Sequence, residues 1–287
     1  MFYNIIFSMQ MQYSFLERRT VFGISGEDRY SFLQGIITND IYKLTSKNKL
    51  VPVKQVQGTY GATKQLTTGI EFTKKSKEKE SDAIYGLILT PQGKLLYDVF
   101  IIEKSDMLLI DCPSGYIEDI INYLKKYKLR AKVEIIDLQN QMKVVVSFQH
   151  IEVDSCFRDP RNPEIGYRAI VDFSYPVCSN TFLEEYEEKR ISLLIPDIIK
   201  DFSPMQFFPA ELGMDLLNAI DYQKGCYIGQ EVTARVKYRG TVRKKLCIIT
   251  SEDKDFENVA SKEYDKFKIL GSSDKKALAM VYINALL

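Results

Sequence analysis

The sequence predicts an α+β protein with more than one domain. Its 287 residues exceed what a single minimal core requires. Short apolar runs typical of strands alternate with helical patterns along most of the chain, whereas strand patterns alone follow residue 239. Hydrophobic residues make up 45% of the chain and charged residues 27%, a balance that indicates a folded protein.

The first predicted elements are a strand, a turn and a helix. Residues 21–25 (VFGIS) form an apolar strand pattern, and residues 26–28 predict a turn that caps the following helix. This helix is expected to end at Gln34 and Gly35, because glycine commonly stops a helix. Residues 38–40 (TND) are then expected to cap the next element.

Residues 53–83 are expected to be an insertion of about the size of a loop plus a hairpin. Residues 74–82 (KKSKEKESD) form a mixed-charge run, and such a run is usually a solvated loop. Surface loops tolerate additions of this kind because the entropy of closing a loop grows slowly with its length.

The middle of the chain predicts a hairpin, in which strands at residues 85–89 and 95–102 flank the turn sequence TPQGK. Further strands and helices are expected at residues 107–111, 116–127, 132–137, 144–148 and 181–194, with C-terminal strands at 246–249 and 277–283. We expect three parts: an N-terminal α+β subdomain of residues 13–105, completed by about 195–237; a second α+β subdomain of residues 106–194; and a small C-terminal β domain of residues 238–287.

Composition narrows the classes of function. A net charge of +1 gives no global electrostatic case for a nucleic-acid or membrane partner, and no apolar stretch approaches the ~20 residues of a membrane helix. The single histidine, His150, argues against a histidine-based metal site or a Ser–His–Asp triad. Five cysteines without a C-x-x-C pair argue against a disulfide framework and a zinc ribbon, and favour a reducing compartment: Cys112, Cys156, Cys178, Cys226 and Cys247.

Residues 224–235 (KGCYIGQEVTAR) are the most informative stretch. Gly225 and Gly229 flank Cys226 and permit backbone angles or close approaches that a side chain would block. The residues after Gly229 can begin a helix whose N–H groups point back toward the loop. A thiol placed there, near Lys224, is expected to be more acidic and more reactive than a core thiol. The alternative is that Cys226 is a small buried hydrophobic residue in a tight turn.

This stretch resembles the signature of the YgfZ family, and most of all its mitochondrial and alphaproteobacterial branch. The resemblance extends to residues 24–41 (ISGEDRYSFLQGIITNDI), 89–94 (LTPQGK) and 159–168 (DPR…GYR). The alternative interpretation of the last block is a turn that an arginine–carboxylate pair stabilises. YgfZ proteins are similar to the glycine-cleavage T-protein, an aminomethyltransferase. The resemblance therefore implies a T-protein-like ring of subdomains around a central cavity, with a small C-terminal β domain.

The resemblance also implies a ligand, because folate lies in the central cavity of relatives. It assigns Arg19, Asn39 and Tyr186 to a tetrahydrofolate site, in which flat rings need aromatic walls and the glutamate tail needs cations. On composition alone, Tyr186 is a packing residue on a helix face. Two departures argue against aminomethyl transfer: residues 192–194 are SLL where T-proteins have Glu-Ala-Gly, and Asp98 alone remains of an acid pair.

The resemblance favours a non-enzymatic accessory factor for assembly or repair of 4Fe–4S proteins, a role linked to tRNA modification. One thiolate cannot hold such a cluster, so Cys226 is expected to be one ligand in a site shared transiently with an iron–sulfur carrier protein. The 4Fe–4S client enzymes are the other expected partners. The remaining signature residues would shape the loop, with Arg235 pairing with Glu231: Lys224, Gly225, Tyr227, Gly229, Gln230, Glu231 and Arg235.

Two alternatives remain open: a folate-dependent one-carbon transferase with Asp98 as its base, and an interaction scaffold that docks through the signature loop. The basic residues between Arg235 and Lys245 are expected to be solvated surface rather than RNA contacts. No arginine or lysine precedes Arg18, so no cationic signal or transit peptide is expected. We expect a monomer, cytoplasmic in a bacterium or in the mitochondrial matrix of a eukaryote.

Overall fold

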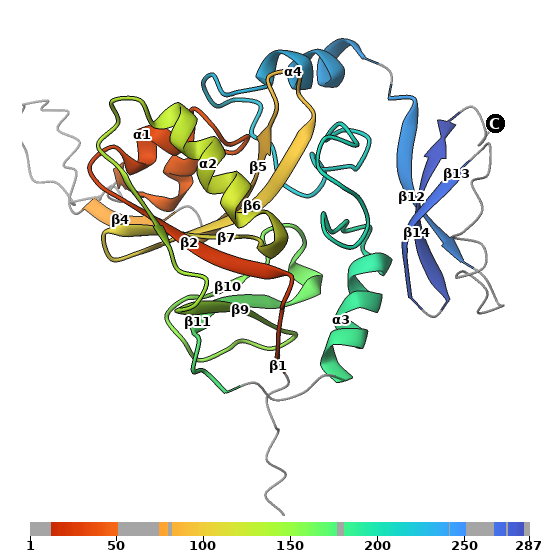
Figure 1. The fold of residues 1–287 in the computed structure, drawn as a ribbon, viewed down its shortest axis with the longest axis horizontal. Helices are drawn as coiled ribbons and strands as arrows, with labels where there is room; N and C mark the ends of the chain where they lie inside the picture. The colour runs from red at the N-terminus through yellow and green to blue at the C-terminus, as the bar shows by residue number, and fades with distance from the viewer. Residues whose placement is uncertain are drawn as a thin grey trace, which may run out of the picture.

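The computed structural model describes residues 13–50, 75–79, 82–176, 181–240, 242–250, 267–273 and 275–283. Figure 1 shows an α+β arrangement in which two sheets lie on one side of helix α3 (Thr181–Ser192) and a small C-terminal sheet lies on the other. Helix α4 (Gln230–Arg239) crosses the upper end of the molecule in this view.

The largest sheet has five strands in the order β5-β6-β7-β2-β8, and its pairing is antiparallel throughout. Its strands are β2 (Arg19–Ser25), β5 (Ala83–Leu89), β6 (Leu95–Lys104), β7 (Met107–Pro113) and β8 (Glu134–Asp137). Every residue of β5 is buried, which accounts for its continuous apolar sequence AIYGLIL. Helix α1 (Arg29–Gln34) follows β2, and helix α2 (Ile117–Lys128) follows β7 and buries one apolar face.

The strands and helices expected between residues 21 and 137 are confirmed, with small shifts of their ends. The start of α1 differs from the prediction. Asp28 makes no side-chain cap, because its Oδ2 accepts a hydrogen bond from the main-chain N–H of Lys132 at 2.8 Å instead. Asp40 does cap the next element, the 3₁₀ helix η1 (Ile41–Leu44). The division expected between residues 105 and 106 falls in the hairpin between β6 and β7, so one sheet spans it.

A second sheet has four strands in the order β1-β9-β11-β10. They are β1 (Tyr13–Phe15), β9 (Met142–Ser147), β10 (Cys156–Arg158) and β11 (Tyr167–Asp172), with the 3₁₀ helices η2 (Ser114–Tyr116) and η3 (Pro163–Ile165) in the connections before β8 and β11. The strand expected at residues 144–148 and the helix expected at 181–194 are confirmed as β9 and α3. Buried side chains of β9 join the same hydrophobic core as those of the first sheet.

A two-stranded sheet stands at the insertion. Strands β3 (Ser46–Leu50) and β4 (Lys75–Lys79) pair antiparallel. Most of the insertion expected at residues 53–83 lies outside the described residues, as do the N-terminal segment before residue 13 and Cys178.

The C-terminal sheet is ordered β12-β14-β13, from β12 (Lys244–Thr250), β13 (Phe267–Ser272) and β14 (Lys276–Tyr282). Two of its strands were expected, and β13 was not. The irregular chain between α3 and α4 is hydrogen-bonded to β6, where Leu95 N–H donates to the Phe207 carbonyl at 3.1 Å, and to the segment after α1, where Thr38 Oγ1 donates to the Ala219 carbonyl at 2.6 Å. Across the described helices, no apolar stretch is long enough to pass through a bilayer.

Candidate functional site

The signature loop presents Cys226 to solvent. Among the cysteines that the structure describes, Cys112 is buried, Cys156 and Cys247 are partly buried, and Cys226 is exposed. Lys224 and Tyr227 on either side are buried, with exposed fractions of 8% and 7%. The chain is therefore fixed on both sides of an accessible thiol, and a buried packing role for Cys226 is wrong.

Lys224 connects the signature loop to the segment at the end of α1. Its Nζ donates hydrogen bonds to the main-chain carbonyls of Gln34, Ile37 and Asn39 at 2.8, 2.6 and 2.8 Å. These carbonyls lie at and after the end of α1, where a helix leaves acceptors unsatisfied. Burial lowers the pKa of Lys224 to about 8. All three N–H donors of the ammonium are used by the carbonyls, so Lys224 anchors the loop to the end of α1.

Gly229 forms the junction between the loop and α4. Its φ of +82° is in the left-handed region, and an added Cβ would lie 2.7 Å from the carbonyl oxygen of Thr90 and 3.0 Å from Cβ of Leu89. The TPQGK turn thus packs directly against the signature loop. Gly225 differs from the expectation, because its φ is not positive and an added Cβ would meet no atom within 4 Å.

The expected helix after Gly229 is confirmed as α4, and so is the pair between Glu231 and Arg235, whose Oε1 and Nη2 lie 2.7 Å apart. Both side chains are largely exposed, so the pair contributes only about 0.3–0.5 kcal/mol. Thr233 Oγ1 donates to the Gly229 carbonyl at 3.0 Å and ties the first turn to the loop. Burial raises the pKa of Tyr227 to about 12, which keeps its hydroxyl neutral.

A second cluster of charged residues lies inside the protein, where the first two sheets meet α3. Arg19 donates to Asp98 Oδ1 at 2.8 Å and to Asp111 Oδ1 at 2.6 Å. Burial by itself lowers the pKa of Arg19, but the charges of Asp111 and Asp98 reverse that effect and hold it above its usual value. Asp98 also accepts a hydrogen bond from the Tyr85 hydroxyl at 3.2 Å and is only 4% exposed. Its carboxylate is therefore occupied and closed to a substrate.

The DPR…GYR block completes this cluster. Arg161 and Asp159 form the expected arginine–carboxylate pair, with bidentate contacts of 3.0 and 2.8 Å. Arg168 donates to Asp111 Oδ2, and its guanidinium carbon lies 3.9 Å from the centre of the Phe100 ring. Both guanidinium groups donate to the hydroxyl of Tyr186, at 3.2 and 3.4 Å.

This arrangement does not fit a folate. The cavity enclosed by these side chains has a volume of about 10 Å³, whereas sites for ligands of this size have roughly 300–1,000 Å³. The arginines that line the cavity are already paired: Arg19 as above, Arg18 with Glu187 and Asp197, and Arg190 with Asp201. No described cation lining this cavity is left for an anionic tail.

The residues expected to bind folate have structural roles instead. Arg19 is held by two aspartates, and Tyr186 is 2% exposed and accepts hydrogen bonds from two arginines. Asn39 Nδ2 donates to the Tyr85 and Asn218 carbonyls, each at 2.8 Å. Sequence analysis missed the part played by Asp111. Its position inside the apolar strand sequence MLLIDCP was the signal, because a carboxylate buried in a strand needs a cationic partner.

No protein-family model matches the chain. It is 29% identical over 245 residues to the "Iron-sulfur cluster assembly factor IBA57 homolog, mitochondrial" of Mycosarcoma maydis, with 79% of this chain and 54% of that protein covered. The homolog of Dictyostelium discoideum is 26% identical over 290 residues, covering 85% and 64%, and IBA57 of Homo sapiens is 26% identical over 254 residues, covering 80% and 64%. Over most of its length the chain is thus distantly similar, at 26–29% identity, to IBA57/YgfZ-type proteins. It spans 54–64% of the length of these IBA57 relatives.

A comparison with solved structures supports the predicted fold. The crystal structure of glycine cleavage system aminomethyltransferase T from Bartonella henselae superimposes with a TM-score of 0.61, covering 95% of this chain and 78% of that one, at 10% sequence identity. The predicted T-protein-like α+β fold is therefore confirmed. At this identity the match supports the fold alone.

Proposed function

We propose that this protein is an accessory factor for iron–sulfur cluster assembly and that Cys226 is a thiolate ligand in a transient cluster-transfer site. The observation that carries the proposal is the exposed thiol of Cys226, held between buried neighbours on an anchored loop. The relatives named above, described as iron–sulfur cluster assembly factors, support the same role.

The cluster is the substrate in this proposal. Cys226 supplies one sulfur, and a 4Fe–4S cluster takes about four ligands. A carrier protein supplies the other ligands, and the thiol of Cys226 passes its proton to the carrier thiolate that it displaces from iron, which leaves as a thiol. Client enzymes with 4Fe–4S clusters then receive the cluster. The relatives are described as mitochondrial, and we place this chain in the same compartment.

The surroundings of Asp98 argue against folate-dependent transfer. Its base would be Asp98, which is bound by Arg19 and Tyr85 inside a cluster that leaves about 10 Å³ of space. The arrangement supports a structural role for Asp98.

Complementation of cells that lack the endogenous factor tests the role of the thiol. Cys226→Ser keeps the size of the side chain and removes the iron ligand, and Cys156→Ser is the matched control at a partly buried cysteine outside the loop. We expect aconitase activity to be lost with Cys226→Ser and kept with Cys156→Ser, at equal protein levels. Normal aconitase activity with Cys226→Ser would overturn the ligand role. A loss of function limited to changes that distort the loop, such as Gly229→Val, would then favour an interaction scaffold.

A further inference from the structure

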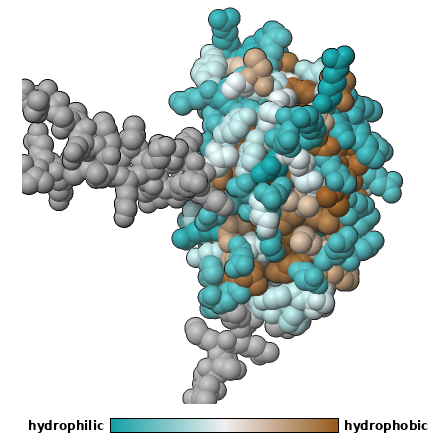
Figure 2. Space-filling view, turned by 90° about the vertical axis from the view of Figure 1, so that its left-hand side faces the viewer, coloured by the Kyte–Doolittle hydropathy of each residue, from teal (hydrophilic) through white to brown (hydrophobic). Residues whose placement is uncertain are grey.

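A groove lies beside the signature loop, where the ends of α1 and α2 approach it. Its volume is about 520 Å³, and its apolar lining includes Phe32 of α1, Ile36 just after that helix, Tyr127 and Leu129 at the end of α2, and Ile228 of the loop. Figure 2, which views the molecule from the left-hand side of Figure 1, shows hydrophobic residues that reach the surface between hydrophilic ones.

Leu129 has two properties that packing does not explain. It is 87% exposed, the highest value among the large hydrophobic residues that the structure describes. Its φ is +43°, a left-handed conformation that is costly for a bulky side chain. The chain therefore holds an aliphatic side chain in water and in a strained backbone at the rim of the groove. A partner that covers Leu129 would recover this cost.

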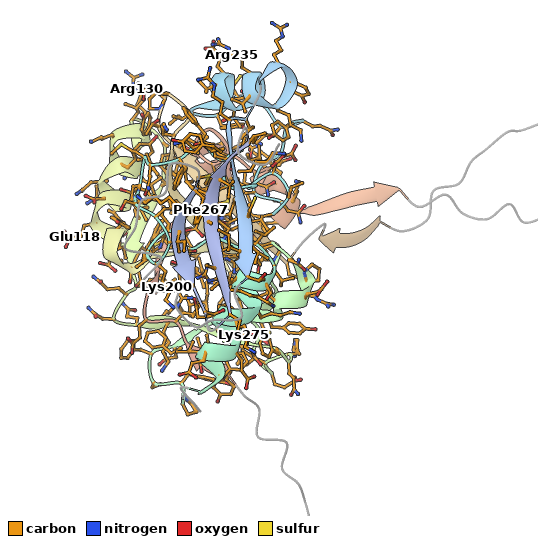
Figure 3. All side chains as sticks on the ribbon, turned by 90° about the vertical axis from the view of Figure 1, so that its right-hand side faces the viewer. Glu118, Arg130, Lys200, Arg235, Phe267 and Lys275 are labelled. Atoms are coloured by element: carbon orange, nitrogen blue, oxygen red, sulfur yellow. The ribbon has the colours of Figure 1, made fainter. Side chains whose placement is uncertain are left out.

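Cations surround Leu129. Lys128 and Arg130 line the groove, and Lys125 and Lys126 precede them on the last turn of α2, where the helix dipole favours positive charge. One carboxylate, Asp28, also lines the groove, and it accepts a hydrogen bond from a main-chain N–H. Figure 3 shows that Arg130, which follows α2, and Arg235, which belongs to α4, project from the same end of the molecule. The groove thus combines an apolar lining with a positive rim.

The groove is coupled to the thiol through the main chain. Ile228 lines it, its N–H donates to the Gly35 carbonyl at 3.2 Å, and it lies two residues after Cys226. A partner seated in the groove therefore contacts the same short loop that displays the sulfur.

We propose that this groove docks an acidic segment with an aliphatic anchor, carried by the protein that delivers or receives the cluster. The acidic groups pair with Lys128 and Arg130, and the anchor covers Leu129. The inference rests on the proposed function for the identity of the partner. The most exposed side chain at the groove is aliphatic, since Leu129 is 87% exposed against 37% for Tyr127, and this favours a protein segment as the occupant. Single-stranded RNA, which is bound mainly by stacking on aromatic side chains, is an alternative that the experiment below tests.

Fluorescence anisotropy tests the groove with the full chain and a short fluorescein-labelled peptide in which Leu and Phe alternate with Glu and Asp. The reference probe is the same peptide with Lys in place of the acidic residues. We expect the acidic peptide to bind at least about tenfold more tightly than the lysine peptide, with an affinity that falls as salt is added. Lys128→Glu with Arg130→Glu should weaken its binding by about tenfold or more, whereas Lys104→Glu, at the exposed last residue of β6, should leave it unchanged.

Leu129→Gly separates docking from folding. Glycine suits a positive φ, so this variant should fold at least as stably as the wild type while it loses the peptide anchor and binds about tenfold more weakly. Equal affinity for both peptides, unchanged binding by Leu129→Gly, or tighter binding of a labelled oligouridylate than of the acidic peptide would each overturn the proposal. Cys226→Ser should leave peptide affinity unchanged. Peptide binding together with normal aconitase maturation by Cys226→Ser would keep the groove and reject the thiol role, and the reverse pattern would reject only the groove.

Discussion

Asp111→Asn is the most direct test of the buried charge cluster. The Asp111 carboxylate is fully buried and accepts hydrogen bonds from two guanidinium groups, Arg19 Nε at 2.6 Å and Arg168 Nη2 at 2.5 Å. Asparagine keeps the shape of the side chain but removes the charge and replaces one acceptor oxygen with an N–H₂ donor. One of the two arginines then faces a donor instead of an acceptor.

The expected loss is large because the partners remain buried. Removing one member of a buried ion pair costs roughly 3–5 kcal/mol, since it leaves an uncompensated charge in a medium of low dielectric constant. Arg168 keeps a more distant contact to Asp159 at 3.8 Å, and Arg19 keeps Asp98, so we expect about 3 kcal/mol, at the lower end of this range.

Urea unfolding measures this loss. The chain has no tryptophan and 18 tyrosines, so tyrosine fluorescence and far-ultraviolet circular dichroism are the suitable probes. Asp106→Asn, at an exposed residue in the turn between β6 and β7, is the matched control and should change the free energy of unfolding by less than about 0.5 kcal/mol. If Asp111→Asn unfolded at the same urea concentration as Asp106→Asn, the cluster would not stabilise the fold as argued.

Three further predictions concern the loop and the effect of pH. Gly229→Ala should cost about 1–3 kcal/mol, because it adds strain at a φ of +82° and a contact of 2.7 Å with the Thr90 carbonyl, whereas Gly225→Ala should be nearly neutral in thermal unfolding. Lys224→Met should leave three carbonyls without a donor, lower the free energy of unfolding by about 1–3 kcal/mol and make the loop more accessible to a protease. The pKa of Glu187 is lowered because its arginine and lysine partners outweigh burial; its stabilising contribution is therefore present above its ordinary value of 4.5 and is lost as the pH falls below it. Thermal unfolding between pH 7 and pH 3 should show a smaller decline for Glu187→Gln than for the wild type.

The sequence predicts the elements that depend on local pattern. The strand at residues 21–25, the hairpin around TPQGK and the start of α4 follow from apolar runs and turn residues, and the structure contains all three. The requirement for Gly229 was also accessible, because a glycine before a helix signals a special backbone angle.

Long-range pairing was not accessible from local pattern. Arg19 meets Asp98 and Asp111 across 79 and 92 residues, and local periodicity does not report which strands lie side by side. The acceptors of Lys224 are main-chain carbonyls 185–190 residues away, which carry no side-chain signature. The position of β7 beside β2 is likewise a property of the whole sheet, and it is why the division expected at residues 105 and 106 falls inside one sheet.

The buried cluster of ion pairs limits which ligands can enter the interior of the protein. The interior of the first two sheets is closed by ion pairs in which Arg168 and Arg161 stack on Phe100, and a flat ligand would have to displace both guanidinium groups from that ring. Each displaced group would leave a carboxylate buried without its partner, a cost of several kcal/mol before any ligand contact is made. Among the cysteines that the structure describes, the exposed thiol lies at the surface, on a loop that Lys224 anchors to the end of α1 beside the groove with its positive rim.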